Sequence, residues 1–243
     1  MKEVTPMSDE VRFSIDGVRV KAHPDQTIME AAEEAGIYIP RLCHMPGLSP
    51  HGSCRVCTVM VNGRPASACT QPVSDGMMVE SDTPVLQEHR RVLIEMLFVE
   101  GNHFCMFCER SGNCELQALA YRFGIAAPRF AYGFPKRELD ASHPHVFFDR
   151  NRCITCARCV RASQELDGKH VFGFVGRSFH KRLAFNAEGP LSETDLEVTD
   201  EALDACPVGA LLRKGEGYKV PIGERRYDHE PIGSEIEARK PAT

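Results

Sequence analysis

The stretch Cys153-Ile-Thr-Cys156-Ala-Arg-Cys159, together with the distant Cys206-Pro207, is the most specific pattern in the sequence. Three cysteines at i, i+3 and i+6, with a remote fourth before a proline, match the ligand spacing of a [4Fe–4S] cluster. Zinc seldom uses this spacing, so a zinc site is only a minor alternative here. A second cluster of this kind would need a further cysteine at the position of Ser163. The pattern therefore predicts one [4Fe–4S] cluster in this part of the chain.

Four more cysteines form a first set in the N-terminal third of the chain. They are Cys43, Cys54, Cys57 and Cys69. A plant-type [2Fe–2S] cluster takes its ligands from one cysteine loop and one distant cysteine, although the first gap here is longer than the plant-type gap. Zinc also accepts four cysteines, but a single Cys-x2-Cys is not the paired spacing of zinc ribbons. The set therefore favours a [2Fe–2S] cluster over zinc.

The middle cysteine set supplies only three thiolates, from Cys105, Cys108 and Cys114. A [4Fe–4S] cubane needs four ligands, and His103 is the nearest candidate for the fourth. An imidazole in place of a thiolate removes a negative charge and raises the reduction potential, as histidine ligation does in Rieske centres. From the residues alone, a capping or solvent-exposed role for His103 is equally well supported.

Turn and capping signals predict a β-grasp module around the first set, over residues 8–82. Residues 11–22 and 57–69 are each typical of a β-hairpin, because an Asp-Gly or Asn-Gly turn separates two β-rich runs. Thr27 is expected to begin a helix between the hairpins, with Glu30 completing a capping box.

Helices and short strands are expected around the two other sets, which makes the predicted fold class α+β. Thr83-Pro84 begins a helix whose buried face is marked by Leu86, Leu93 and Leu97. Four segments follow the β-grasp module: a small helical Cys3His [4Fe–4S] segment over 83–124, a linker over 125–145, a bacterial-ferredoxin-like [4Fe–4S] domain over 146–217, and a tail over 218–243. The tail is charged and has no core pattern, so we expect it to lie on a partner or to be mobile.

The composition excludes several classes of protein. The most apolar window, residues 92–99, is interrupted by Glu95 and is too short to span a membrane. The polar start, residues 1–6, lacks the apolar core of a signal peptide, so we expect a cytoplasmic protein. The net charge of −5, without a basic stripe, gives no reason to expect nucleic acid. Where thiols stay reduced, eleven cysteines indicate metal or redox chemistry.

Motifs for a catalytic centre are missing from the sequence. No G-x-G-x-x-G follows a predicted strand, and no phosphate-binding P-loop occurs. Every cysteine already belongs to one of the three sets, so none is left for a nickel–iron site. We therefore predict no catalytic residue, and expect NAD, flavin and hydrogen chemistry to belong to other chains.

The order of the three sets resembles a known family arrangement. A β-grasp [2Fe–2S] module, a Cys3His loop and a ferredoxin-like domain recur in the large peripheral-arm subunit of respiratory complex I, in iron-only hydrogenases and in NAD-dependent formate dehydrogenases. Over nearly its whole length the chain is most similar to the small, gamma-type diaphorase-side subunit of NAD-reducing bidirectional nickel–iron hydrogenases. The stretches that look like that subunit specifically are residues 98–105, 112–117 and 220–228.

The resemblance implies a cytoplasmic hetero-oligomer that couples hydrogen oxidation to NAD⁺ reduction. In it, this chain would carry one [2Fe–2S] and two [4Fe–4S] clusters and relay single electrons. Its partners would be a flavin- and NAD-binding diaphorase subunit and the small and large subunits of a nickel–iron hydrogenase. The family's Cys3His cluster also supports His103 as a ligand.

Two alternatives remain open at this stage. One is an equivalent relay subunit of an NAD-dependent formate dehydrogenase or of a complex I-like assembly. The other belongs to a different class, a zinc-stabilised interaction scaffold, which would be colourless and hold two or three zinc ions under the usual four-ligand rule.

Overall fold

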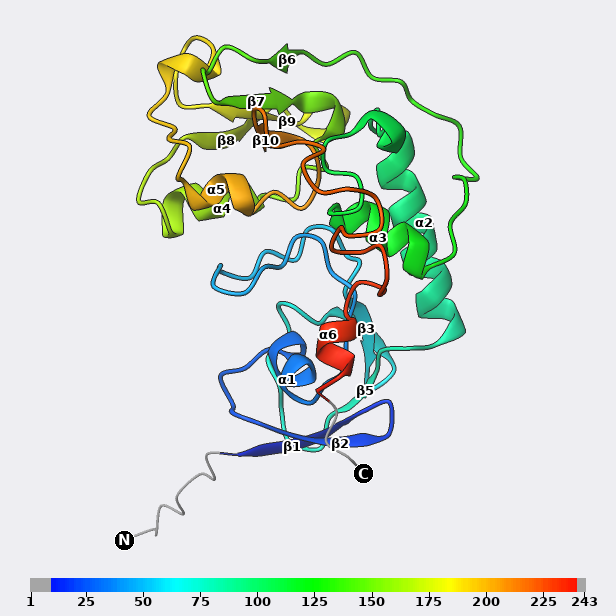
Figure 1. The fold of residues 1–243 in the computed structure, drawn as a ribbon. Coiled ribbons are helices and arrows are strands. Elements are labelled where there is room, and N and C mark those ends of the chain that lie inside the picture. Colours follow the sequence, from blue (N-terminus) through cyan, green and yellow to red (C-terminus); the bar gives the residue numbers. More distant parts are fainter. Residues whose placement is uncertain (1–9, 240–243) are drawn as a thin grey trace, which may run out of the picture. The chain divides into compact units, whose positions relative to one another are not determined.

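The computed structural model describes residues 10–239 of the 243-residue chain, so the polar start at residues 1–6 lies outside the described part. These residues form two compact units, drawn as a ribbon in Figure 1. Of the described residues, the first unit holds 10–41, 55–89 and 233–239, and the second holds 42–54 and 90–232. None of the helices in the described part is both long and apolar enough to cross a membrane.

The first unit is built on a five-stranded sheet with the order β2-β1-β5-β3-β4. Its strands are β1 Val11–Ile15, β2 Val18–Ala22, β3 Thr58–Val61, β4 Arg64–Ser67 and β5 Met78–Glu80. Only β1 and β5 are parallel. Both predicted hairpins are confirmed. Their turns, Asp16-Gly17 and Asn62-Gly63, have positive φ at both residues, which suits the twist of tight hairpins.

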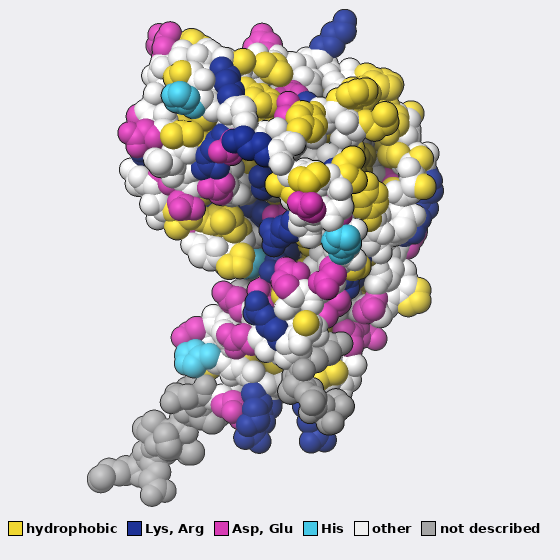
Figure 2. Space-filling view, viewed as in Figure 1, with side chains coloured by type: hydrophobic (Ala, Val, Ile, Leu, Met, Phe, Trp, Pro, Cys, Tyr) yellow, Lys and Arg dark blue, Asp and Glu magenta, His cyan; other side chains and the backbone are white. Residues whose placement is uncertain are grey.

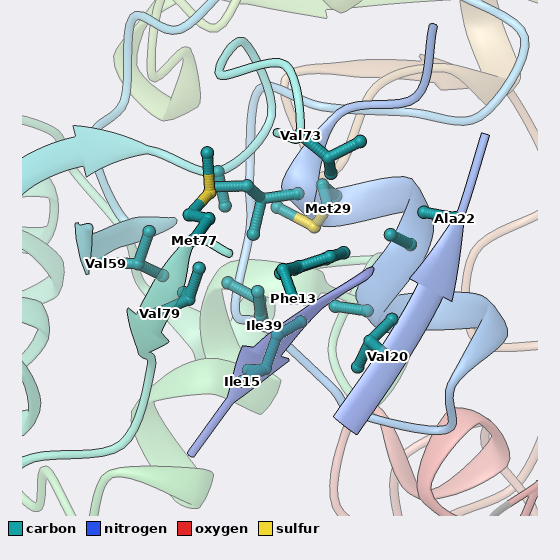
Figure 3. Packing of buried hydrophobic residues seen from close by; sticks show 14 of the residues in the cluster. Phe13, Ile15, Val20, Ala22, Met29, Ile39, Val59, Val73, Met77 and Val79 are labelled. Carbon is teal, nitrogen blue, oxygen red and sulfur yellow. The ribbon is translucent and has the colours of Figure 1, made fainter. Parts of the chain in front are cut away.

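Helix α1, Ile28–Glu34, covers one face of this sheet and buries its apolar side. It begins as predicted, with a capping box. The Thr27 side chain accepts a hydrogen bond from the Glu30 amide, and the Glu30 carboxylate accepts one from the Thr27 amide at 2.7 Å. Figure 3 shows Met29 of the helix packed against Phe13 and the neighbouring strand residues. This core fixes the hairpins that carry part of the first cysteine set.

Helix α2, Pro84–Val99, starts where the sequence predicts, and the Thr83 hydroxyl accepts the Leu86 amide at 3.3 Å. The prediction of which residues form its buried face is partly wrong. Leu93 and Leu97 are only half-buried, whereas the fully buried positions include Ile94. Arg90 is also 1% exposed, and a buried arginine cannot be found from hydrophobic periodicity.

The second unit contains short elements arranged around loops. They are α3 Glu115–Arg122, β6 Leu139–Asp140, β7 Val146–Asp149, α4 Arg158–Glu165, β8 Phe172–Val175, β9 Arg182–Phe185, α5 Glu201–Asp204 and β10 Leu211–Arg213. The strands form a sheet of order β10-β7-β6 and a separate β8-β9 pair. The α+β class is confirmed. On the face drawn in Figure 2, charges of both signs are interspersed and hydrophobic side chains gather on one side of this unit.

The tail, which shows no core pattern in the sequence, nevertheless contributes two buried side chains. Its described part includes helix α6, Ser234–Glu237, and both Ile232 and Ile236 are buried. Earlier tail residues bind the middle cysteine loop within the second unit: the Tyr218 hydroxyl donates to the Phe107 carbonyl at 2.7 Å, and further hydrogen bonds follow up to Tyr227. Tail contact with a partner stays a prediction.

Candidate iron–sulfur sites

The third cysteine set lines one small cavity in the second unit. Cys153, Cys156, Cys159 and Cys206 all contribute to its wall, and most other lining residues are apolar. The first three come from the loop before α4 and its first turn, and the fourth follows α5. The structure therefore brings together the four residues that the sequence pattern predicts.

The loop of the third set owes its shape to two residues in the left-handed region. Thr155 has φ 50° and Ala157 has φ 62°, a conformation that costs non-glycine residues on the order of 1 kcal/mol each. Backbone hydrogen bonds from Thr155 to Cys153 and from Arg158 to Cys156 lower the pKa of those thiols. Such inward-turned N–H groups make an anion-binding concavity suited to thiolates.

Burial dominates the protonation of these thiols. It raises the pKa of Cys153 to about 11 and of Cys156 to about 12, and it raises the pKa of Cys159 well above the ordinary value. The buried thiols are therefore protonated at neutral pH in the metal-free chain. A metal must displace these protons, because thiolates are the ligands.

The middle set lines a second cavity, and His103 belongs to it. The cavity wall includes His103, Cys105, Cys108 and Cys114. The pKa of Cys114 is raised to about 12 by burial. The structure thus places the predicted fourth ligand beside the three cysteines.

His103 has the features of a candidate metal ligand. Its Nε2 is buried and has no hydrogen-bond partner among the described residues. The ring also forms a hydrogen bond with the Leu97 backbone. Because Nε2 has no partner, this hydrogen bond involves Nδ1. Burial, reinforced by the positive charge of Arg152, lowers the pKa of His103 to about 4. The ring is neutral at pH 7 with its lone pair on Nε2, the usual arrangement of a metal-bound histidine.

Two glycines allow close approach to the middle set. A Cβ on Gly101 would lie 2.6 Å from His103 Nε2, and one on Gly209 would lie 2.5 Å from the Cys108 sulfur. Both separations are shorter than real contacts, so no larger residue fits without displacing a candidate ligand. Sequence reasoning missed both glycines, since nothing local to them signals the approach.

A buried ion pair joins the loops of the middle and third sets. Arg158 donates two hydrogen bonds to Glu115, both of 2.7 Å, and the arginine is only 4% exposed. The Glu115 amide also donates to the Pro207 carbonyl at 2.9 Å. Glu115 follows Cys114 directly, and Pro207 follows Cys206. A single backbone hydrogen bond therefore joins the residues that follow one ligand of each set.

The first set is divided between the two units. Cys57 and Cys69 lie in the first unit with their sulfur atoms 3.4 Å apart. Two thiolates on one tetrahedral metal at about 2.3 Å would lie about 3.8 Å apart, so the sulfur atoms of this pair lie near the separation that a single metal requires. Cys43 and Cys54 lie on the loop of residues 42–54 in the second unit.

Helix α4 anchors that loop within the second unit. Arg161 donates to the backbone carbonyls of Cys43 and Ser49, and Glu165 accepts the Ser49 amide at 2.7 Å. Sequence reasoning did not find this anchor, because its partners are more than one hundred residues apart. The helix that follows the third set therefore also fixes part of the first.

The donor sets fit iron–sulfur clusters. Within residues 10–239, no three His, Cys, Asp or Glu side chains are grouped so as to hold a metal ion. The cysteines of the middle and third sets instead surround cavities, as do ligands that each bind a different iron of a cluster. The chain is therefore of the iron–sulfur protein class.

Comparisons with known proteins agree. Residues 8–84 match the model of a 2Fe-2S iron-sulfur cluster binding domain, residues 90–129 the NADH-ubiquinone oxidoreductase-G iron-sulfur binding region, and residues 143–212 the ferredoxin-like domain of NADH-quinone oxidoreductase subunit 3. The chain is 40% identical over 223 residues to the gamma chain of the NAD-reducing hydrogenase HoxS of Cupriavidus necator, covering 91% of this chain and 95% of that one. It belongs to the family of that hydrogenase chain.

Two further relatives support the assignment. A crystal structure of NAD⁺-reducing [NiFe]-hydrogenase in the H2-reduced state contains a chain of 46% identity with a TM-score of 0.89, and the match covers 93% of this chain and 98% of that one. The mitochondrial 78 kDa subunit of NADH-ubiquinone oxidoreductase from Candida albicans is 34% identical over 215 residues, which make up 87% of this chain but 29% of that protein.

Proposed function

We propose that this chain is the electron relay of a cytoplasmic NAD-reducing nickel–iron hydrogenase. It would carry single electrons between a flavin- and NAD-binding diaphorase subunit and the small and large hydrogenase subunits. The observation that carries the proposal is the match, over 93% of the chain, to a subunit of an NAD⁺-reducing [NiFe]-hydrogenase. The three cysteine sets supply the ligands that a relay needs.

Each cluster has a proposed ligand set in this chain. They are Cys43, Cys54, Cys57 and Cys69 for one [2Fe–2S] cluster; His103, Cys105, Cys108 and Cys114 for one [4Fe–4S] cluster; and Cys153, Cys156, Cys159 and Cys206 for a second [4Fe–4S] cluster. The predicted domain boundaries, 8–82, 83–124 and 146–217, are supported by family-model matches over 8–84, 90–129 and 143–212.

The chain's own residues would position and tune these groups. Bound iron–sulfur clusters supply one-electron redox chemistry. His103 contributes a neutral ligand, which leaves the middle site one negative charge short of a four-thiolate site. The hydrogen bond from the Glu115 amide to Pro207 ties the loop of Cys114 to that of Cys206, so the two [4Fe–4S] sites are linked by a short route.

Native pull-down of the tagged chain tests the assembly. The proposal expects co-purifying subunits that contain nickel and flavin and that reduce NAD⁺ with hydrogen. Recovery of a molybdenum protein without nickel would instead support the formate dehydrogenase alternative. Recovery of membrane-bound quinone-reducing subunits would support a complex I-like assembly.

A further inference from the structure

The second unit carries a basic cleft that lies outside the three cysteine sets. It has a volume of about 750 Å³ and lies between residues 135–138 and strand β9. Five cations and one carboxylate line it, namely Lys136, Arg137, Arg150, Lys181, Arg182 and Glu138. The chain as a whole has a net charge of −5, so this concentration of positive charge is a local feature.

The cations of the cleft are not neutralised by the chain itself. The Arg150 guanidinium lies 5.1 Å from the ring centre of Phe148 and 4.9 Å from that of Phe185. The Lys181 amino group lies 4.2 Å from the ring centre of Phe174. Across residues 10–239, none of the five cations lies within ion-pair distance of a carboxylate. Aromatic faces therefore fix two of the charges while leaving them available to an anion.

Strand β9 presents a backbone edge to the cleft. Within the part of the chain that the structure describes, it pairs only with β8, and all four of its residues line the cleft. The Asn186 amide donates to the Val171 carbonyl, so these two residues form a hydrogen-bonded pair. Hydrogen-bonded and non-hydrogen-bonded pairs alternate along an antiparallel ladder. The backbone groups of Leu183 and Phe185 therefore point away from β8. The Leu183 carbonyl accepts a long hydrogen bond from Arg150 Nε at 3.5 Å, which agrees with that direction.

We propose that the cleft binds an extended, acidic segment of a partner subunit, which adds to β9 as a further strand. An exposed strand edge gives affinity through main-chain hydrogen bonds, and neighbouring side chains give specificity. Native proteins commonly cover such edges, and the five cations select for Asp and Glu side chains. The inference rests on the proposed place of the chain in a multi-subunit enzyme.

Charge reversal tests the chemistry of the segment. The double variant Lys136→Glu/Arg182→Glu, purified as the native complex, is expected to lose partner subunits at a lower salt concentration than wild type during size-exclusion chromatography. A matched control, Arg19→Glu/Arg64→Glu, makes the same charge change on exposed first-unit positions and is expected to keep them. Equal salt stability of both variants would overturn the proposal. Unchanged iron content separates this outcome from a failure of the relay function.

Residue-resolved hydrogen exchange tests strand addition directly. The amides of Leu183 and Phe185 are expected to be slowed in the complex and fast in the isolated, iron-loaded chain. The Ala184 amide faces β8 and is expected to be slow in both, which makes it an internal control. Equal exchange of Leu183 and Phe185 in both states would contradict the proposal. Slow exchange of the Leu183 and Phe185 amides already in the isolated chain would overturn the proposal, and would indicate that a second copy of this chain covers the β9 edge.

Discussion

At the scale of single residues, the buried nitrogen of His103 is the proposed fourth ligand of the middle site. We predict that His103→Ala alters only the EPR signal of one [4Fe–4S] cluster, because the remaining eleven ligands are untouched. His103→Cys should keep the cluster and lower its midpoint potential, since a thiolate adds a negative charge. His23→Ala, at an exposed position in the first unit, serves as the control. If every signal persisted unchanged in His103→Ala, another group would be the ligand.

The ion pair between Glu115 and Arg158 allows a test of how nearby charges shift the midpoint potential of a cluster, because the two residues should act in opposite directions. Reduction adds a negative charge to a cluster, so a nearby cation favours the reduced form. We predict that Arg158→Met lowers the midpoint potential of the third-set cluster and that Glu115→Gln raises it, as measured by redox titration. Glu10→Gln, in an exposed pair with Arg12 in the first unit, should shift it little. Shifts of the same sign in the two main variants would indicate structural damage rather than tuning.

At the scale of elements, two loops approach the middle site so closely that only glycine fits. We predict that Gly101→Ala and Gly209→Ala each reduce iron by about four atoms per chain, because the added Cβ displaces His103 or Cys108. Gly173→Ala is the matched control, since a Cβ there meets nothing within 4 Å. Iron content is measured after anaerobic purification. Full iron content in both test variants would contradict this prediction and show that the loops can move to make room for the added Cβ.

Local elements could be predicted from the sequence, and non-local ones could not. The capping box at Thr27 and the Asn62-Gly63 turn are encoded within a few residues, so the helix and hairpin begin where expected. Strand β9 was missed because the connection from β8, residues 176–181, contains no Asn-Gly or Asp-Gly turn to signal a hairpin. The Glu115–Arg158 pair spans 43 residues, and no spacing rule connects them. The cysteine sets could be grouped because ligand spacing is itself local.

At the scale of the whole molecule, the raised thiol pKa values link stability to pH. In the metal-free chain, folded Cys114 and Cys156 titrate with a pKa of about 12, whereas the ordinary thiol pKa is 9.0. Their contribution to stability is therefore fully present below pH 9 and is lost as pH rises toward 12. We predict that the free energy of unfolding of the metal-free chain falls over this window, as measured in urea.

The iron-loaded chain provides the comparison for that experiment. With clusters bound as proposed, its cysteines would already be thiolates on metal, so its stability should not show the same loss between about pH 9 and pH 12. A metal-free chain whose stability rose over this window would contradict the burial of its thiols.

The central claim is that twelve side chains of this molecule hold three iron–sulfur clusters. Metal analysis combined with Mössbauer spectroscopy of the anaerobically purified chain tests it most directly. We predict a brown protein with about ten iron atoms per chain, as one [2Fe–2S] and two [4Fe–4S] clusters. A colourless protein containing two or three zinc ions and no iron would contradict it and support the zinc-stabilised scaffold instead.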